Sequence, residues 1–160
     1  TIDNFENIYE NKWLNMMRDK LGLFGEDKND KKLINDLLVW MESNKADYTN
    51  TFCYLMNIKV GNQSIYVDKN FTSWLKKWED RILINKGLKE KSIVLMRKNN
   101  PIVIPRNHKV EEALEATNDD NLELINKLLV ILKKPYNNQD NIMNYQSPSS
   151  NNNYQTFCGT

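Results

Sequence analysis

Residues 71–84 read FTSWLKKWEDRILI, and the spacing of their apolar side chains decides the fold class. These side chains recur every three or four residues, which is the period of one face of an α-helix. They are Phe71, Trp74, Leu75, Trp78 and Ile82. Two tryptophans four residues apart are more typical of a core-facing stripe than of a platform for a ligand. The stretch therefore predicts an amphipathic helix that packs on a core and ends at Gly87.

The same spacing predicts three helices before this stretch. The first ends at Gly22, the second begins with Asp30 as its cap, and the third, YTNTFCYLMN, is capped by Asp47. The side chain of Asp47 is expected to accept a hydrogen bond from a backbone N–H two or three residues on. Residues 59–70 are interpreted as a connector, because their SIYV segment has no partner strand.

After the opening stretch, the chain is expected to continue as shorter helices separated by proline. SIVLMRKNN is a short helix that stops at Pro101, and two further helices, through VEEALEA and NLELINKLLVILKK, form an antiparallel hairpin. The fold class is therefore all-α, an irregular helical subdomain over residues 1–136. Residues 137–160 are polar and rich in Asn and Ser, which predicts a mobile tail that ends in a cysteine peptide.

The segment PIVIPRNH, between those helices, carries the residues with the most specific structural predictions. Pro101 and Pro105 hold it extended, because residues before proline avoid the helical region. Asn107 is placed to cap the following helix. The guanidinium of Arg106 is expected to clamp a carboxylate on another helix. Both residues are interpreted as structural rather than catalytic.

Composition excludes several classes of partner. Lys and Arg number 22 against 21 Asp and Glu, so the net charge is +1, whereas a nucleic-acid interface needs clustered positive charge. No apolar run reaches the ~18 residues that would span a bilayer, and the opening TIDNFENIYENK is too polar for a secretory signal. We expect a cytoplasmic protein, or a mitochondrial one if the source is eukaryotic, without nucleic-acid or membrane partners.

The sequence offers few groups for catalysis. Its five glycines form no phosphate-binding loop, and His108 is its only histidine. A lone histidine beside a helix start is more often structural than catalytic. The acidic pairs Glu111–Glu112 and Asp119–Asp120 are more typical of helix starts than of a metal site, since adjacent residues on a helix face different ways. No catalytic, cofactor-binding or metal-binding residue is therefore predicted.

The two cysteines have different settings. Cys53 lies in TFCYLM, a mostly apolar helix, where a buried free cysteine behaves as a small hydrophobe. Cys158 follows a Ser/Asn-rich stretch at the third position from the end, where an accessible thiol can serve as a redox residue. Composition alone leaves an incidental free cysteine equally open.

Several segments together resemble the C-terminal region of the selenoprotein O family of pseudokinases, and they occur in the family's own order. The most specific are the proline–arginine–asparagine segment and the terminal cysteine peptide. The matching segments are KLGL (20–23), DYTNTF (47–52), NNPIVIPRNHKVEEAL (99–114), LLVILKKPY (128–136) and YQTFCGT (154–160).

The resemblance implies a protein-kinase-like fold, of which this chain would be a C-terminal part. Members bind ATP with a divalent metal, Mg or Mn, and transfer AMP to Ser, Thr or Tyr hydroxyls of proteins. The motifs that bind nucleotide and metal lie N-terminal to the region matched here, so no position of this sequence corresponds to them. Cys158 does correspond, because it stands where some members have selenocysteine and others cysteine, and there it can pair with a cysteine near the activation loop. That partner is absent from this chain.

Two classes of function remain open. The chain is either a helical part that supports the catalytic lobe of an adenylyltransferase and supplies the redox residue Cys158, or a free-standing module that binds a protein through an apolar groove. The partner in the first case is the missing N-terminal kinase-like part of the same protein, which in turn acts on protein substrates. A part separated from its lobe should expose an apolar patch beyond the few hundred Å² usual for a monomer.

Overall fold

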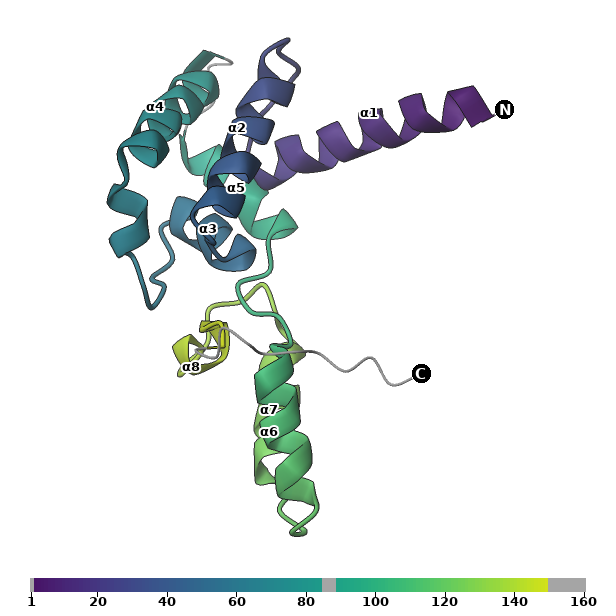
Figure 1. Ribbon diagram of the computed structural model, residues 1–160, viewed down its shortest axis with the longest axis vertical. Helices are drawn as coiled ribbons and strands as arrows, with labels where there is room; N and C mark the ends of the chain where they lie inside the picture. Colours follow the sequence, from purple (N-terminus) through teal and green to yellow (C-terminus); the bar gives the residue numbers. More distant parts are fainter. Residues whose placement is uncertain (1, 85–88, 150–160) are drawn as a thin grey trace. The chain divides into compact units, whose positions relative to one another are not determined.

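The structure is a computed structural model in which residues 2–84 and 89–149 are described. Within these ranges every regular element is helical and there is no strand, so the predicted all-α class is confirmed (Figure 1). None of the helices described is long and apolar enough to cross a membrane. The elements in chain order are α1 (Ile2–Lys20), α2 (Asp30–Ser43), α3 (Tyr48–Leu55), the 3-10 helix η1 (Ser64–Val67), α4 (Lys69–Ile84), α5 (Lys89–Asn99), α6 (Asn107–Thr117), α7 (Glu123–Leu132) and α8 (Met143–Gln146).

The chain divides into two compact units, Thr1–Asn100 and Pro101–Thr160. The division falls at a proline because Pro101 can neither continue α5 nor let Asn100 stay helical. The expected boundary at residue 136, between a helical part and a tail, stays a prediction. The short helix α8 lies inside the expected tail, yet its Gln146 is buried against the second unit.

Tryptophans organise the core of the first unit. The apolar stripe of α4 faces the core as predicted: Phe71, Trp74, Trp78 and Ile82 are buried, and Leu75 is half-buried. Each buried indole also satisfies its N–H: Trp74 Nε1 donates to the carbonyl of Leu33 and Trp78 Nε1 to that of Leu21, both at 2.8 Å. These hydrogen bonds join α4 to α2 and to the end of α1. Because hydrogen bonds are directional, they fix the orientation in which the apolar surfaces pack.

Gly22 ends α1 and lets it approach α5 closely. Its φ of +68° lies in the left-handed region that favours glycine. A Cβ atom at this position would lie 2.6 Å from the carbonyl oxygen of Ser92 on α5, so a larger residue would force the helices apart. Two bonds reinforce the contact, from Asn100 Nδ2 to the carbonyl of Lys20 (2.8 Å) and from Lys20 Nζ to that of Asn99 (3.1 Å).

The connector over residues 59–70 contains more structure than the sequence predicted. Its SIYV segment is the 3-10 helix η1, so the loop interpretation was wrong at these residues, although no strand forms. Tyr66 of η1 is buried and stacks on Tyr54 of α3, with ring centroids 4.1 Å apart. An aromatic contact between distant residues, which local periodicity cannot reveal, therefore orders this segment.

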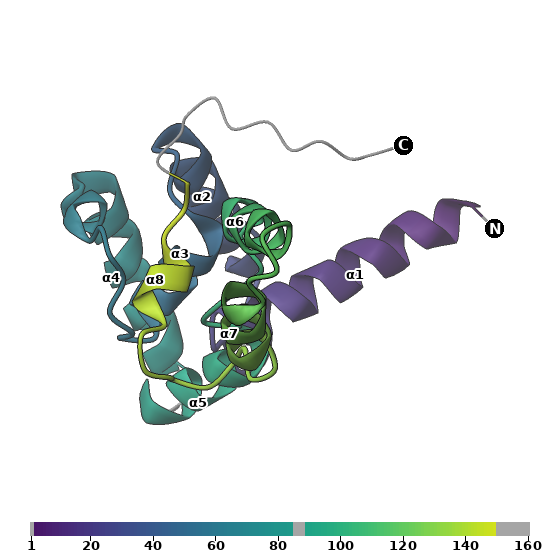
Figure 2. The ribbon, with the colours of Figure 1, turned by 90° about the horizontal axis from the view of Figure 1, so that it is seen from below.

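The second unit is built on the predicted helical hairpin. Helices α6 and α7 lie side by side in both views (Figures 1 and 2). The extended segment before α6 is held at both sides: Ile102 N donates to the carbonyl of Pro135 at 2.7 Å, and Gln146 Nε2 donates to the carbonyl of Ile102 at 2.8 Å. Residues close to both ends of the described part of this unit, 101–149, thus meet at Ile102.

Candidate functional site

A buried ionic cluster of Arg18, Asp30 and Arg81 joins three helices of the first unit. The Asp30 side chain at the start of α2 is 0% exposed. Arg18 Nε of α1 donates to its Oδ2 at 2.7 Å, and Arg81 Nε of α4 donates to its Oδ1 at 2.7 Å. The backbone N–H of Asp27 donates to Oδ2 at 2.9 Å. Both carboxylate oxygens are therefore satisfied, as a buried charge requires.

Arg81 extends the cluster to the loop between α1 and α2. Its Nη2 donates to the carbonyl of Gly25 at 3.3 Å and its Nη1 to that of Phe24 at 3.3 Å. Burial alone would raise the pKa of Asp30, but the hydrogen bonds from Arg81 and Arg18 hold it below its usual value. Asp30 is therefore ionised at neutral pH and links α1, α2 and α4.

Asp30 was predicted as the cap of α2, and that prediction is wrong. The cap position is Asn29, which makes no side-chain cap bond, and Asp30 is the first residue of the helix. The two arginines take both carboxylate oxygens, although Oδ2 also accepts from the nearby Asp27 N–H. Arg18 and Arg81 lie 12 and 51 residues away, so no local spacing reveals the cluster. The one available signal was Arg81 itself, which stands beside Ile82 on the apolar stripe of α4.

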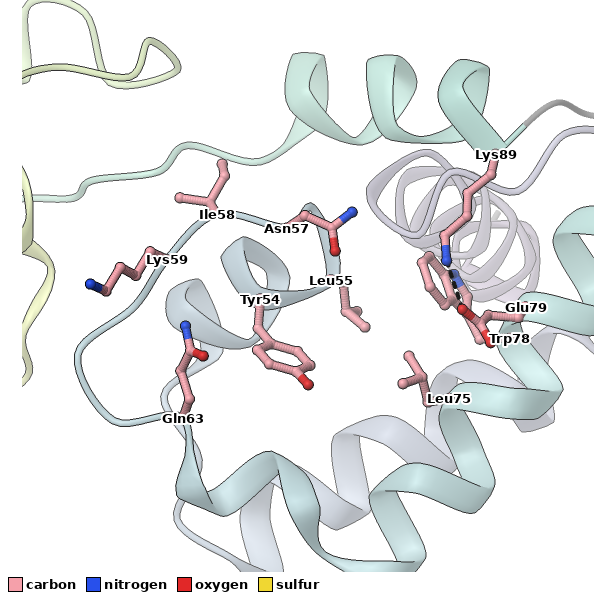
Figure 3. Close-up of a pocket in the computed structure, with 10 residues that line it drawn as sticks. All are labelled: Tyr54, Leu55, Asn57, Ile58, Lys59, Gln63, Leu75, Trp78, Glu79 and Lys89. Atoms are coloured by element: carbon pink, nitrogen blue, oxygen red, sulfur yellow. Dashed lines mark hydrogen bonds and ion pairs between the residues drawn. The ribbon is translucent and has the colours of Figure 1, made fainter.

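A pocket of about 340 Å³ opens between α3, the connector and the facing sides of α4 and α5 (Figure 3). Leu55 and Leu75 point toward each other across it, and the amides of Asn57 and Gln63 stand on its rim. Lys89 Nζ and Glu79 Oε1 form an ion pair at 2.7 Å at one end. The pocket can offer amide and hydroxyl hydrogen bonds to a small polar group, but it pairs no nucleophile with a base.

Metal-ligating side chains do not gather in the described part of the chain. There, no group of three or more His, Cys, Asp or Glu side chains could hold a metal ion. His108 lies at the start of α6 beside Arg106 and Lys109, and burial together with these two cations lowers its pKa. A largely neutral imidazole at neutral pH follows from this setting.

The residues predicted to be structural have mixed outcomes. Asp47 caps α3: its Oδ1 accepts from the N–H of Asn50 at 2.8 Å, which is one of the two donors expected. Asn107 does not cap α6, because the helix begins at Asn107 itself and the cap position is Arg106, with no side-chain cap bond. Arg106 Nη2 donates to the backbone carbonyl of Gln146 at 2.8 Å, so this contact is with a carbonyl where a carboxylate was expected.

The remaining predictions concern the prolines and the cysteines. Pro101 follows the end of α5, and both Pro101 and Pro105 lie in the non-helical stretch before α6, as expected. Cys53 is fully buried in α3, in keeping with a packing role. Cys158, the predicted redox residue, lies outside the described residues.

Comparisons with known proteins identify the family. The model of the protein adenylyltransferase SelO family matches residues 1–133. The chain is 54% identical over 161 aligned positions to the protein nucleotidyltransferase YdiU of Pelagibacter ubique, covering 99% of this chain and 33% of that protein. It is 44% identical to the protein of the same name from Bacillus cytotoxicus and 40% identical to that from Clostridium beijerinckii, again covering 33% of each.

The chain thus spans about a third of the length of the curated relatives that it matches, while nearly all of the chain is aligned with them. The family model covers residues 1–133, which include all of the first unit and the whole helical hairpin of the second. The chain belongs to the protein adenylyltransferase SelO family.

Proposed function

We propose that this chain is the C-terminal helical part of a protein adenylyltransferase, whose longer chain transfers AMP from ATP to Ser, Thr or Tyr hydroxyls of proteins. The observation that carries the proposal is the family match over residues 1–133. Relatives that align with nearly the whole chain are named protein nucleotidyltransferases, and they are about three times as long. The nucleotide, the Mg or Mn ion and the protein substrate bind the remainder of that longer protein.

In this proposal the helices form part of a protein-kinase-like fold and support its catalytic lobe. The ionic cluster favours a supporting role, because its paired charges are enclosed by their own helices. A group held in this way stabilises a scaffold, whereas a catalytic carboxylate must reach substrate or metal. The protein that contains the chain acts in the cytoplasm, and Cys158 supplies a redox-sensitive thiol to the catalytic part.

The competing function, a free-standing module that binds protein through an apolar groove, has less support. The pocket beside α3 is rimmed by Asn57, Gln63 and the Lys89–Glu79 pair, which is a polar lining for such a groove. Large exposed apolar side chains are found on several other elements of the described residues, and four of them lie on α1. This distribution favours a part that has been separated from its neighbours over a complete module.

The experiment that tests the proposal compares the chain with the longer protein that contains it. Each is incubated with Mg²⁺ or Mn²⁺, acceptor proteins, and ATP labelled at either the α- or the γ-phosphate. AMP transfer forms a bond from the acceptor oxygen to the α-phosphorus and releases pyrophosphate. Only the α-label should therefore appear on protein, and only with the longer protein. Transfer of the γ-label, or α-label transfer by the chain alone, would contradict the proposal.

A further inference from the structure

Helix α1 carries apolar side chains on two different sides. On one side, Met17 and Leu21 are buried in the first unit. On the other, four large apolar side chains are exposed to solvent, and at ~100° per residue they fall within an arc of about 100°. We call these four the outer face; they are Phe5 (69% exposed), Ile8 (51%), Tyr9 (62%) and Met16 (47%).

The outer face runs along α1 and is densest at its N-terminal end, with Lys12 between Tyr9 and Met16. Phe5 and Tyr9 stack, with ring centroids 6.5 Å apart, and the other two residues follow at helical spacing. In both ribbon views the N-terminal half of α1 extends away from α2, α4 and α5 of its own unit (Figures 1 and 2). One exposed apolar residue needs no explanation, but a helix that is apolar on two sides is normally covered on both.

We propose that the outer face of α1 packs against the part of the longer family protein that lies outside this chain. This inference rests on the proposed function. The relatives carry about two thirds of their length beyond the region matched here, and a helical third with an uncovered apolar strip is complementary to an apolar surface on that remainder. The outer face is therefore an internal interface of the adenylyltransferase.

A second copy of this chain fits the outer face less well. Lys12 is exposed, lies four residues from both Ile8 and Met16, and so stands in the middle of the strip. A twofold pairing centred on the strip would bring the Lys12 ammonium groups of two copies together, which is unfavourable. A different partner can place a carboxylate or a backbone carbonyl opposite Lys12.

Thiol protection tests the proposal at single residues. Tyr9→Cys places a thiol on the outer face, and Asn7→Cys places one on the opposite side of α1, since residues two apart in a helix point away from each other. Each variant is labelled under native conditions in two settings: the chain alone, and the Pelagibacter ubique relative in which this chain replaces the matched third. Mass spectrometry reads each site, and the buried Cys53 reports whether the fold is intact.

In the chain alone both new thiols should react fast. In the longer protein Tyr9→Cys should react at least about tenfold more slowly, and Asn7→Cys should change little. Equal reactivity of Tyr9→Cys in both settings, with Cys53 protected, overturns the proposal. If Cys53 reacts in the fused protein, the fold there is not intact, and a binding measurement replaces the labelling test. It gives the affinity of the chain for the relative from which the matched third has been removed. Phe5→Ser should then weaken binding at least about tenfold, and Asn7→Ser should not.

Two further outcomes separate this inference from its alternatives. Sedimentation of the chain alone should show a monomer, and self-association abolished by Phe5→Ser would assign the outer face to a second copy and overturn the proposal. Assaying the longer protein for α-label transfer distinguishes the two levels of inference. Protection of Tyr9→Cys without AMP transfer would support the interface and contradict the proposed function. AMP transfer without protection would support the proposed function and contradict the interface.

Discussion

The two units bury different kinds of polar group. The first encloses a carboxylate and two guanidinium groups, with Asp30 between Arg18 and Arg81. The second joins its segments through hydrogen bonds to backbone carbonyls: the buried Gln146 amide donates to Ile102, and the half-buried Arg106 guanidinium donates to Gln146. A buried charge that loses its partner costs several kcal/mol, whereas a neutral hydrogen bond contributes about 1 kcal/mol. The first unit should therefore be the more sensitive to substitution and to acid.

The largest effect is expected from Asp30→Ala. The substitution removes the buried carboxylate that both guanidinium groups share and leaves Arg18 only its exposed partner Glu26, which should cost about 3–5 kcal/mol of unfolding free energy. That is a large share of the ~5–15 kcal/mol typical of a domain. Urea unfolding measures it, with Asp36→Ala as the matched control, because Asp36 pairs with Lys32 on the exposed side of the same helix. The control should lose less than about 1 kcal/mol of unfolding free energy. Equal losses in the two variants would mean that the buried cluster contributes no more to stability than an exposed ion pair.

Acid should weaken the first unit through the same carboxylate. The pKa of Asp30 is lower in the folded chain than in the unfolded one, so its contribution is fully present above the unfolded value of about 3.9. The contribution is lost as the pH falls from there through the folded pKa. Unfolding free energy measured from pH 6 to pH 2 should fall in this window and fall less steeply in Asp30→Asn. Parallel curves for the two proteins would assign the acid sensitivity to other groups.

A smaller effect is expected at the cap of α3. Asp47→Ala removes the acceptor for the N–H of Asn50 and should cost about 0.5–2 kcal/mol. Asp47→Asn keeps a capping oxygen and should lose much less. The denaturant midpoint measures both. An unchanged midpoint in Asp47→Ala would show that the cap contributes nothing to stability.

The smallest effect on stability is expected in the second unit. Gln146→Ala removes the amide that donates to the carbonyl of Ile102, which should cost about 1 kcal/mol. Hydrogen exchange, read separately in the two units, should show faster exchange in residues 101–149 and no change around Asp30. A loss as large as that of Asp30→Ala would remove the contrast between the units.

The cysteines allow a prediction without a change in sequence. Cys53 is fully buried and should label slowly under native conditions, whereas Cys158 should label fast if it is the accessible redox thiol proposed here. Mass spectrometry gives the rate at each site. Faster reaction at Cys53 than at Cys158 would contradict both assignments.

Local patterns in the sequence predicted the helices and their apolar faces but not the cluster that joins them. Trp74 and Trp78 were placed in the core because their spacing is periodic, and Asp47 was recognised because a cap acts within three residues. The prediction for Asp30 failed for the same reason. Helix capping is a local rule and pairs the Asp30 side chain with its own helix, whereas its strongest partners lie on α1 and α4. Ion pairs between residues that are far apart in the sequence produce no periodic pattern that a single sequence could show.

Asn107 and η1 were mispredicted through the same limitation. An asparagine near a helix start is a common cap, yet α6 begins one residue earlier than a cap at this position requires. The local pattern of the SIYV segment predicts a loop, whereas stacking of Tyr66 on Tyr54 holds the segment as a 3-10 helix. For the function, local motifs predicted no site in this chain, and the resemblance over ordered segments carried the assignment to the family.

The most direct test of the supporting role follows AMP transfer and the folding of the first unit together. The Pelagibacter ubique relative carrying this chain in place of the matched third is heated in steps. Label transfer from α-labelled ATP and the reactivity of the buried Cys53 thiol are measured at each temperature. Transfer should be lost over the same range in which Cys53 becomes reactive, and Asp30→Asn should move both transitions down together. Transfer that persists after Cys53 is exposed would show that the catalytic part does not need the support of this chain.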